Sequence, residues 1–190
     1  MDKQAGPPAN HRSIFWISVL ALFTAAFANA ARVGASGAMK AELFDPHDAA
    51  HAGELIGAAL GNSFLGFALS LLVISPLLDT FGVKRTVLFA ALCFIAGPAL
   101  ILFAASTADY ATMSTLLNLG MVLSGFGWGA TEGSINPLCT TLYPGDKTGK
   151  LNSLHAWWPA GLIVGGVAIL LLTSNDVVDW RLLIGLVMVP

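Results

Sequence analysis

Three residues in the fourth long apolar run of the chain could do chemistry inside a membrane. Trp128, Glu132 and Asn136 are spaced four residues apart, so on a helix they share one face. Ionisable side chains in such runs usually face a bundle interior and often mark transport paths. Because desolvation favours the neutral form of a carboxyl group, Glu132 could carry a proton. The alternative is a structural hydrogen-bond acceptor, and Pro137 should end the usable part of this helix.

A second polar group lies at the start of the next run. Asn152 and His155 are three residues apart and would share a helix face. Amide and imidazole groups can bond sugar hydroxyls, and the indole of Trp158 offers a flat apolar surface with one donor. These residues could instead belong to a tryptophan belt at the membrane interface. Asn62, in the second run, is a further candidate for the wall of a polar cavity.

Arg32 is a positive charge in the first apolar run, and Asn29 precedes it by about one turn. By helical rise, Arg32 lies about 27 Å from Ile14. That depth is near the outer membrane boundary, where an arginine can snorkel towards water. If the helix instead continues to Met39, Arg32 is a charge inside the membrane and needs a partner such as Glu132. The sequence leaves both interpretations open.

Nothing in the sequence predicts an enzyme, a cofactor or a metal site. There is no nucleophile–base pair with a supporting spacing and no phosphate-binding loop. His47, His51 and Glu54 are spaced as zinc ligands could be, but we expect a solvated loop there. The net charge of −2 comes with no basic block, so we expect no nucleic-acid partner.

The composition is typical of an all-α integral membrane protein. Of the 190 residues, 56% are hydrophobic and 11% are charged, whereas soluble domains carry about 25% charged residues. About 20 apolar residues cross the hydrocarbon core as a helix. Five runs reach that length and a sixth, incomplete, follows them, at about 14–36, 52–78, 86–105, 111–142, 151–173 and 180–190. Because the last run holds about half a span, we expect a fragment or a truncated product.

The loop charges predict the orientation. Six basic residues fall on one side and two on the other, which places residues 1–13 in the cytoplasm of a multi-pass protein of the inner or plasma membrane. The six are Lys3, Arg12, Lys84, Arg85, Lys147 and Lys150. A signal peptide cleaved at "ANA" (28–30) is the alternative for the first run, and we favour a retained helix because the apolar run continues.

Glycines recur at four-residue spacing in three runs, which predicts close helix packing in lipid. The sets are Gly57 and Gly61; Gly125, Gly129 and Gly133; and Gly161 and Gly165.

The stretch "SPLLDTFGVKRTVL" (75–88) joins the second and third runs. Asp79, Gly82, Lys84 and Arg85 give this loop an acid, a turn residue and a basic pair. Their order resembles the conserved loop of the major facilitator superfamily, written G-x-L-a-D-r-x-G-r-(K/R)-x-x-l. The chain departs from that pattern at Ser75, Thr80 and Val83. The resemblance implies a loop that participates in conformational change.

A second stretch, 132–166, resembles the fucose permease group of sugar:proton symporters within that superfamily. An E-x-x-x-N-P motif and an L-N-x-x-(H/Q) motif are matched by Glu132, Asn136, Pro137, Leu151, Asn152 and His155. The resemblance implies two six-helix halves around a central cavity. Residues 14–190 would form the N-terminal half, with a C-terminal half in cis or in trans as its partner. The acid that the group often carries in its first helix is absent from 14–36.

The sequence therefore predicts a secondary active transporter in the lipid bilayer. We expect proton-coupled uptake of a sugar or a similar hydroxylated solute by alternating access, because the polar set around Glu132 suits hydroxyl groups. The alternatives are an exporter of drugs or other small molecules of the same superfamily and a truncated membrane protein that transports nothing.

Overall fold

The computed structural model describes residues 10–173 and 179–188, and all regular elements there are helices. Residues 1–9, 174–178 and 189–190 lie outside this description. They include Lys3, one of the six basic residues, and the last two residues of the sixth run. Helices lie over all six predicted runs, but the first helical segment continues to Asp48 and the fifth run is divided between two helices. They are α1 (His11–Met39), the π-helix η1 (Lys40–Phe44), α2 (Asp45–Asp48), α3 (Ala52–Phe81), α4 (Val83–Ala104), α5 (Tyr110–Leu142), α6 (Lys147–His155), α7 (Trp157–Thr173) and α8 (Trp180–Leu186).

Four helical segments are long and apolar enough to cross a membrane, which confirms a membrane protein. They are His11–Asp48, Ala52–Phe81, Val83–Ala104 and Lys147–Leu171. The expected six spans are therefore not all found among the described residues. The 33-residue helix α5 is absent from the four, because glycine, serine and threonine lower its hydropathy. This composition suits a helix that contacts other helices instead of lipid.

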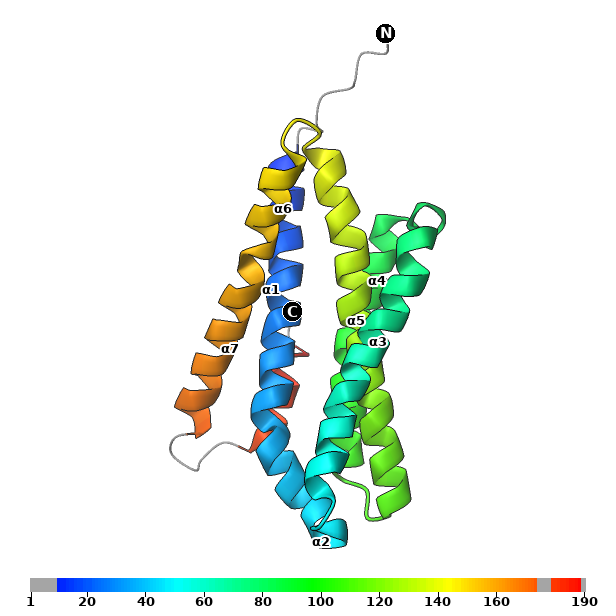
Figure 1. The fold of residues 1–190 in the computed structure, drawn as a ribbon, viewed down its shortest axis with the longest axis vertical. Helices are drawn as coiled ribbons and strands as arrows, with labels where there is room; N and C mark the ends of the chain where they lie inside the picture. Colours follow the sequence, from blue (N-terminus) through cyan, green and yellow to red (C-terminus); the bar gives the residue numbers. More distant parts are fainter. Residues whose placement is uncertain (1–9, 174–178, 189–190) are drawn as a thin grey trace.

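Helix α5 is the central element of the molecule. It packs along its length against α3 and α4, while α1 packs against α7. Figure 1 shows α1 (blue) beside α7 (orange) on one side and α3, α4 and α5 on the other. The short helix α8 contacts α1 and α4. Helix α5 is thus packed between α3 and α4, with α1 as a further neighbour.

Glycines provide the close contacts in two of the three predicted places. A Cβ on Gly161 would lie 2.7 Å from the carbonyl oxygen of Phe23 and 2.7 Å from Cβ of Ala26, both in α1. On α5, a Cβ on Gly129 would lie 2.5 Å from the carbonyl oxygen of Phe67 in α3. Among the described residues, no atom lies within 4 Å of a Cβ placed on Gly57 or Gly61, so the predicted close contact is not found there.

Local chemistry sets several helix boundaries. Gly82 has φ +78° and is the single residue between α3 and α4, a conformation that favours glycine. Asp109 caps α5 by accepting a hydrogen bond from the backbone N–H of Thr112 at 2.8 Å. Asp146 caps α6 through the N–H of Gly149 at 3.1 Å.

Of two prolines in this region, Pro159 coincides with a helix break and Pro137 does not. Pro159 cannot donate to the carbonyl of His155, and α6 ends at His155 before α7 begins at Trp157. Pro137 lies inside α5, which continues to Leu142, so the expectation that it ends the usable helix was wrong.

Candidate functional site

The predicted face of α5 is present as a direct hydrogen bond. The Nε1 of Trp128 donates to Oε1 of Glu132 at 2.7 Å. Trp128 is buried and Glu132 is half-buried. One turn of helix separates the two residues, so the contact follows from the spacing. The carboxylate thus has one fixed hydrogen-bond donor and stays partly accessible.

Trp128 is the centre of an aromatic cluster that joins three helices. Its ring centroid is 4.1 Å from that of Phe67 and 5.6 Å from that of Phe64, both in α3. The ring of Trp158 in α7 stacks on it, with centroids 4.8 Å apart and planes inclined by 16°. The sequence did not identify Phe64 or Phe67, because only the fold brings α3 to this face.

Asn136 and His155 form the second contact of the predicted site. The Nε2 of His155 lies 3.1 Å from Oδ1 of Asn136, and the contact is a hydrogen bond when Nε2 carries the proton. His155 is exposed and Asn136 is half-buried. The pair links α6 to α5. Asn152 is exposed and lies outside this pair.

Arg32 is buried, contrary to the snorkelling interpretation. Helix α1 continues to Met39, and only 2% of the Arg32 surface is exposed. Among the described residues, none of Nε, Nη1 and Nη2 has a hydrogen-bond partner. The alternative partner, Glu132, accepts from Trp128 instead. Asn29 is half-buried one turn before Arg32.

Asn62 belongs to a different polar contact. Its Nδ2 donates to Oδ1 of Asn118 at 2.7 Å, and Nδ2 of Asn118 donates to the carbonyl of Ser114 at 2.7 Å. Asn118 is ten residues from Trp128, which is about 15 Å along the helix. This bridge therefore joins α3 to α5 away from the aromatic cluster. Asn118 was the missed residue, and its polarity in an apolar run was the available signal.

The loop residues Asp79, Lys84 and Arg85 are exposed around Gly82. In the part of the chain that the structure describes, none of the three forms an ion pair.

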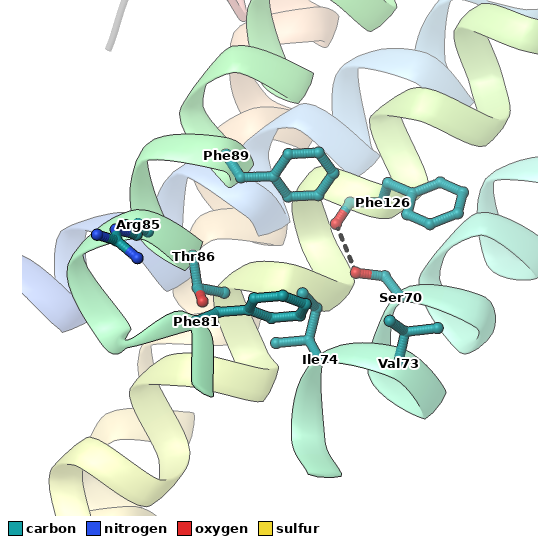
Figure 2. A pocket seen from close by; sticks show the side chains of 8 residues that line it. All are labelled: Ser70, Val73, Ile74, Phe81, Arg85, Thr86, Phe89 and Phe126. Carbon is teal, nitrogen blue, oxygen red and sulfur yellow. Dashed lines mark hydrogen bonds between the residues drawn. The ribbon is translucent and has the colours of Figure 1, made fainter. Parts of the chain in front are cut away.

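An apolar pocket of about 370 Å³ lies between α3, α4 and α5. Figure 2 shows the rings of Phe81, Phe89 and Phe126 around it, with Arg85 at one side. Within it, Oγ of Ser70 donates to the carbonyl of Phe126 at 3.0 Å. Apart from Arg85, its lining residues are not among the predicted site residues.

Metal ligands do not gather within residues 10–173 and 179–188: no group of three or more His, Cys, Asp or Glu side chains could hold an ion. His51 pairs with Asp48 at 2.9 Å, and the ring of His47 lies 4.7 Å from that of Tyr110.

A family model described as "Sugar (and other) transporter" matches residues 12–190. The chain belongs to the sugar (and other) transporter family. The match includes every helix from α1 to α8 except the first residue of α1. No curated protein and no solved structure matches the chain. Family membership and the four span candidates make this a multi-pass membrane protein of a family that moves sugars and related small molecules.

Proposed function

We propose that this sugar-transporter family member is a secondary active transporter that takes up a sugar or a similar hydroxylated solute together with protons. The observation that carries the proposal is the Trp128–Glu132 hydrogen bond at 2.7 Å. It places an ionisable group on the central helix, in direct contact with an aromatic cluster shared by three helices. Carboxylates inside membranes often mark ion pathways and proton relays.

Protonation of Glu132 would change the contacts of Trp128 with the neighbouring helices. An ionised carboxylate accepts a hydrogen bond about twice as strong as a neutral one, so proton binding weakens its contact with Trp128. The indole also stacks on Trp158. A change at Glu132 is therefore passed from α5 to α7, where alternating access requires helices to move relative to one another.

The polar groups beside this path suit a hydroxylated solute. The Asn136–His155 contact can open to offer an amide and an imidazole to sugar hydroxyls. The half-buried indole of Trp158 is the nearby ring that can offer a face to a sugar. The resemblance to the fucose permease group supports the same substrate class. In this proposal a C-terminal half completes the cavity, residues 79–85 form the conformational loop, and the N-terminus is cytoplasmic in the inner or plasma membrane.

The test is uptake of a sugar panel into proteoliposomes, with and without an inward proton gradient. Wild-type protein should accumulate a solute only with the gradient. Glu132→Gln keeps the shape and an acceptor for Trp128, so it should retain downhill exchange while losing uphill accumulation. Unchanged uphill uptake by Glu132→Gln would remove Glu132 from the mechanism. Glu54→Gln, an exposed acid at the start of α3, serves as the matched control.

The apolar pocket of Figure 2 favours a second candidate, export of an apolar compound. Its lining of phenylalanine and aliphatic side chains suits a hydrophobic substrate. Efflux of a fluorescent apolar dye that is slowed by Phe89→Ala, with no uptake of any sugar, would favour export over uptake.

A further inference from the structure

Arg32 lies on the inward face of α1 among small side chains. Ala25, Ala28, Ala35 and Met39 share this face at alternating spacings of three and four residues, and all are buried. Ala28 and Ala35, one turn on either side of Arg32, are 0% and 1% exposed. Arg32 is thus the one long and charged side chain on a face otherwise made of alanine and methionine.

A guanidinium in this position is costly without a partner. An arginine stays charged at all physiological pH values, and transfer of a charge from water into a protein interior is unfavourable unless it is paired and hydrogen-bonded. All three nitrogens of Arg32 are without a partner in the described part of the chain. Glu132, the candidate acid, accepts from Trp128, and the described residues include no ion pair between Glu132 and Arg32.

The neighbours of Arg32 on α1 pack against the aromatic cluster of the candidate site. Ala28 and Ala31 belong to the same buried cluster as Trp128, with Phe67 and Trp158 packed against it. Ala35, on the other side, belongs to a cluster with Ile184 of α8. The residues that flank Arg32 along α1 therefore pack against the aromatic cluster on one side and against α8 on the other. An aromatic face next to a cation is an arrangement that can hold a ring bearing an acid group.

We propose that Arg32 binds the carboxylate of the transported solute, so that the substrate is a sugar acid such as a hexuronate. This inference rests on the proposed function, which it deepens by assigning a charge to the solute. The planar guanidinium presents parallel N–H groups that fit both oxygens of a carboxylate. The carboxylate would supply the missing hydrogen bonds, and the sugar ring would lie towards the Trp128 cluster.

Ligand binding by the full-length natural protein in detergent tests this directly. The probes are glucuronate and galacturonate, each compared with its neutral sugar, and the readout is the rise in Tm with ligand concentration. A hexuronate should raise the Tm at concentrations at least tenfold below those its neutral sugar needs. Arg32→Gln should abolish that difference, whereas Arg32→Lys, which keeps the charge without the fork, should retain part of it. Arg12→Gln removes an exposed arginine and should behave as wild type.

The ligand-free stability separates binding from structure. If the Arg32 guanidinium has no hydrogen-bond partner until a ligand binds, Arg32→Gln without ligand should have a Tm equal to or above that of wild type. The proposal is overturned if no hexuronate binds better than its neutral sugar, if Arg32→Gln binds both as wild type does, or if that variant loses stability without ligand, which would reveal a protein partner.

Failure of this inference differs from failure of the proposed function. Hexuronate binding that depends on Arg32, without proton-driven uptake in proteoliposomes, supports the binding site and contradicts the transport mechanism. Proton-driven uptake of neutral sugars without hexuronate binding contradicts the role of Arg32 and leaves the transport mechanism supported.

Discussion

The indole rings of Trp128 and Trp158 stack with their centroids 4.8 Å apart, and they connect α5 to α7. The same Trp128 donates its N–H to Glu132. One side chain therefore contacts both the candidate proton carrier and the neighbouring helix. The N–H at the edge of the Trp128 ring donates to the Glu132 carboxylate, whereas the face of the ring stacks on Trp158. The two contacts therefore do not compete.

The Trp128–Trp158 stack should contribute a measurable coupling energy. In a double-mutant cycle with Trp128→Leu and Trp158→Leu, we expect a coupling free energy of unfolding of about 0.5–1.5 kcal/mol. Chemical denaturation in detergent measures it. Trp157 provides the control, since its ring contacts Trp16 instead, at 5.8 Å. A Trp128–Trp157 coupling as large as the Trp128–Trp158 coupling would contradict a specific stack.

Gly161 should be far less tolerant of a side chain than Gly166 on the same helix. A Cβ at Gly161 would meet Phe23 and Ala26 at 2.7 Å, whereas at Gly166 it would meet no atom of the described residues within 4 Å. We expect Gly161→Ala to lower the free energy of unfolding by about 1–3 kcal/mol, because α1 and α7 must separate. Gly166→Ala should be neutral or stabilising by up to about 1 kcal/mol, because alanine favours a helix.

Thermal unfolding of the two alanine variants, side by side, measures this difference. Equal Tm values for Gly161→Ala and Gly166→Ala would show that α1 and α7 do not approach as closely as described.

The cap of α5 should make stability depend on acid pH. Hydrogen bonds from Thr112 lower the pKa of Asp109 below its usual value. A carboxyl group with a depressed folded-state pKa stabilises the protein above its unfolded-state pKa, and that contribution is lost as the pH falls through the folded value. Asp109→Ala should therefore lower the Tm at neutral pH, and its difference from wild type should shrink below about pH 4.

Asp109→Asn is the control for the cap, since asparagine keeps an acceptor but has no titrating group. Its Tm should lie between those of wild type and Asp109→Ala at neutral pH. A gap between wild type and Asp109→Ala that stays constant from pH 7 to pH 3 would contradict a role for the ionised carboxylate.

The fold was predictable where the signal is local. Hydropathy and a rise of 1.5 Å per residue located the long helices α3, α4 and α5 to within a few residues. The extension of the first helical segment to Asp48 and the division between α6 and α7 were not predicted. The four-residue spacing of Trp128 and Glu132 placed them on one face, and a hydrogen bond between them is found. Such contacts lie within one helix, so the sequence alone contains the geometry.

The site was less predictable where contacts cross between helices. Phe67 and Asn118 meet Trp128 and Asn62 only because α3 lies along α5, and no spacing in the sequence encodes that rotation. The burial of Arg32 depends on how far α1 continues and on which neighbours cover it. The two prolines illustrate the same limit, since Pro159 coincides with a helix break and Pro137 does not.

The last prediction concerns the end of the bundle opposite the His155 region, where Arg181 of α8 binds Glu42 of η1. Both guanidinium Nη atoms contact the two carboxylate oxygens, one of them at 3.0 Å, and Nε1 of Trp180 donates to the same carboxylate at 2.8 Å. Glu42 and Arg181 are 43% and 35% exposed, so water screens the pair. A double-mutant cycle with Glu42→Gln and Arg181→Met should give a coupling of about 0.2–1 kcal/mol, which falls as the salt concentration is raised.

Because η1 follows α1 directly, loss of this pair should release the α1–α8 contact and leave the α3–α5 packing unchanged. Amide hydrogen exchange that rises in α8 but not in α5 of Arg181→Met would establish this, and a uniform rise across both helices would contradict it.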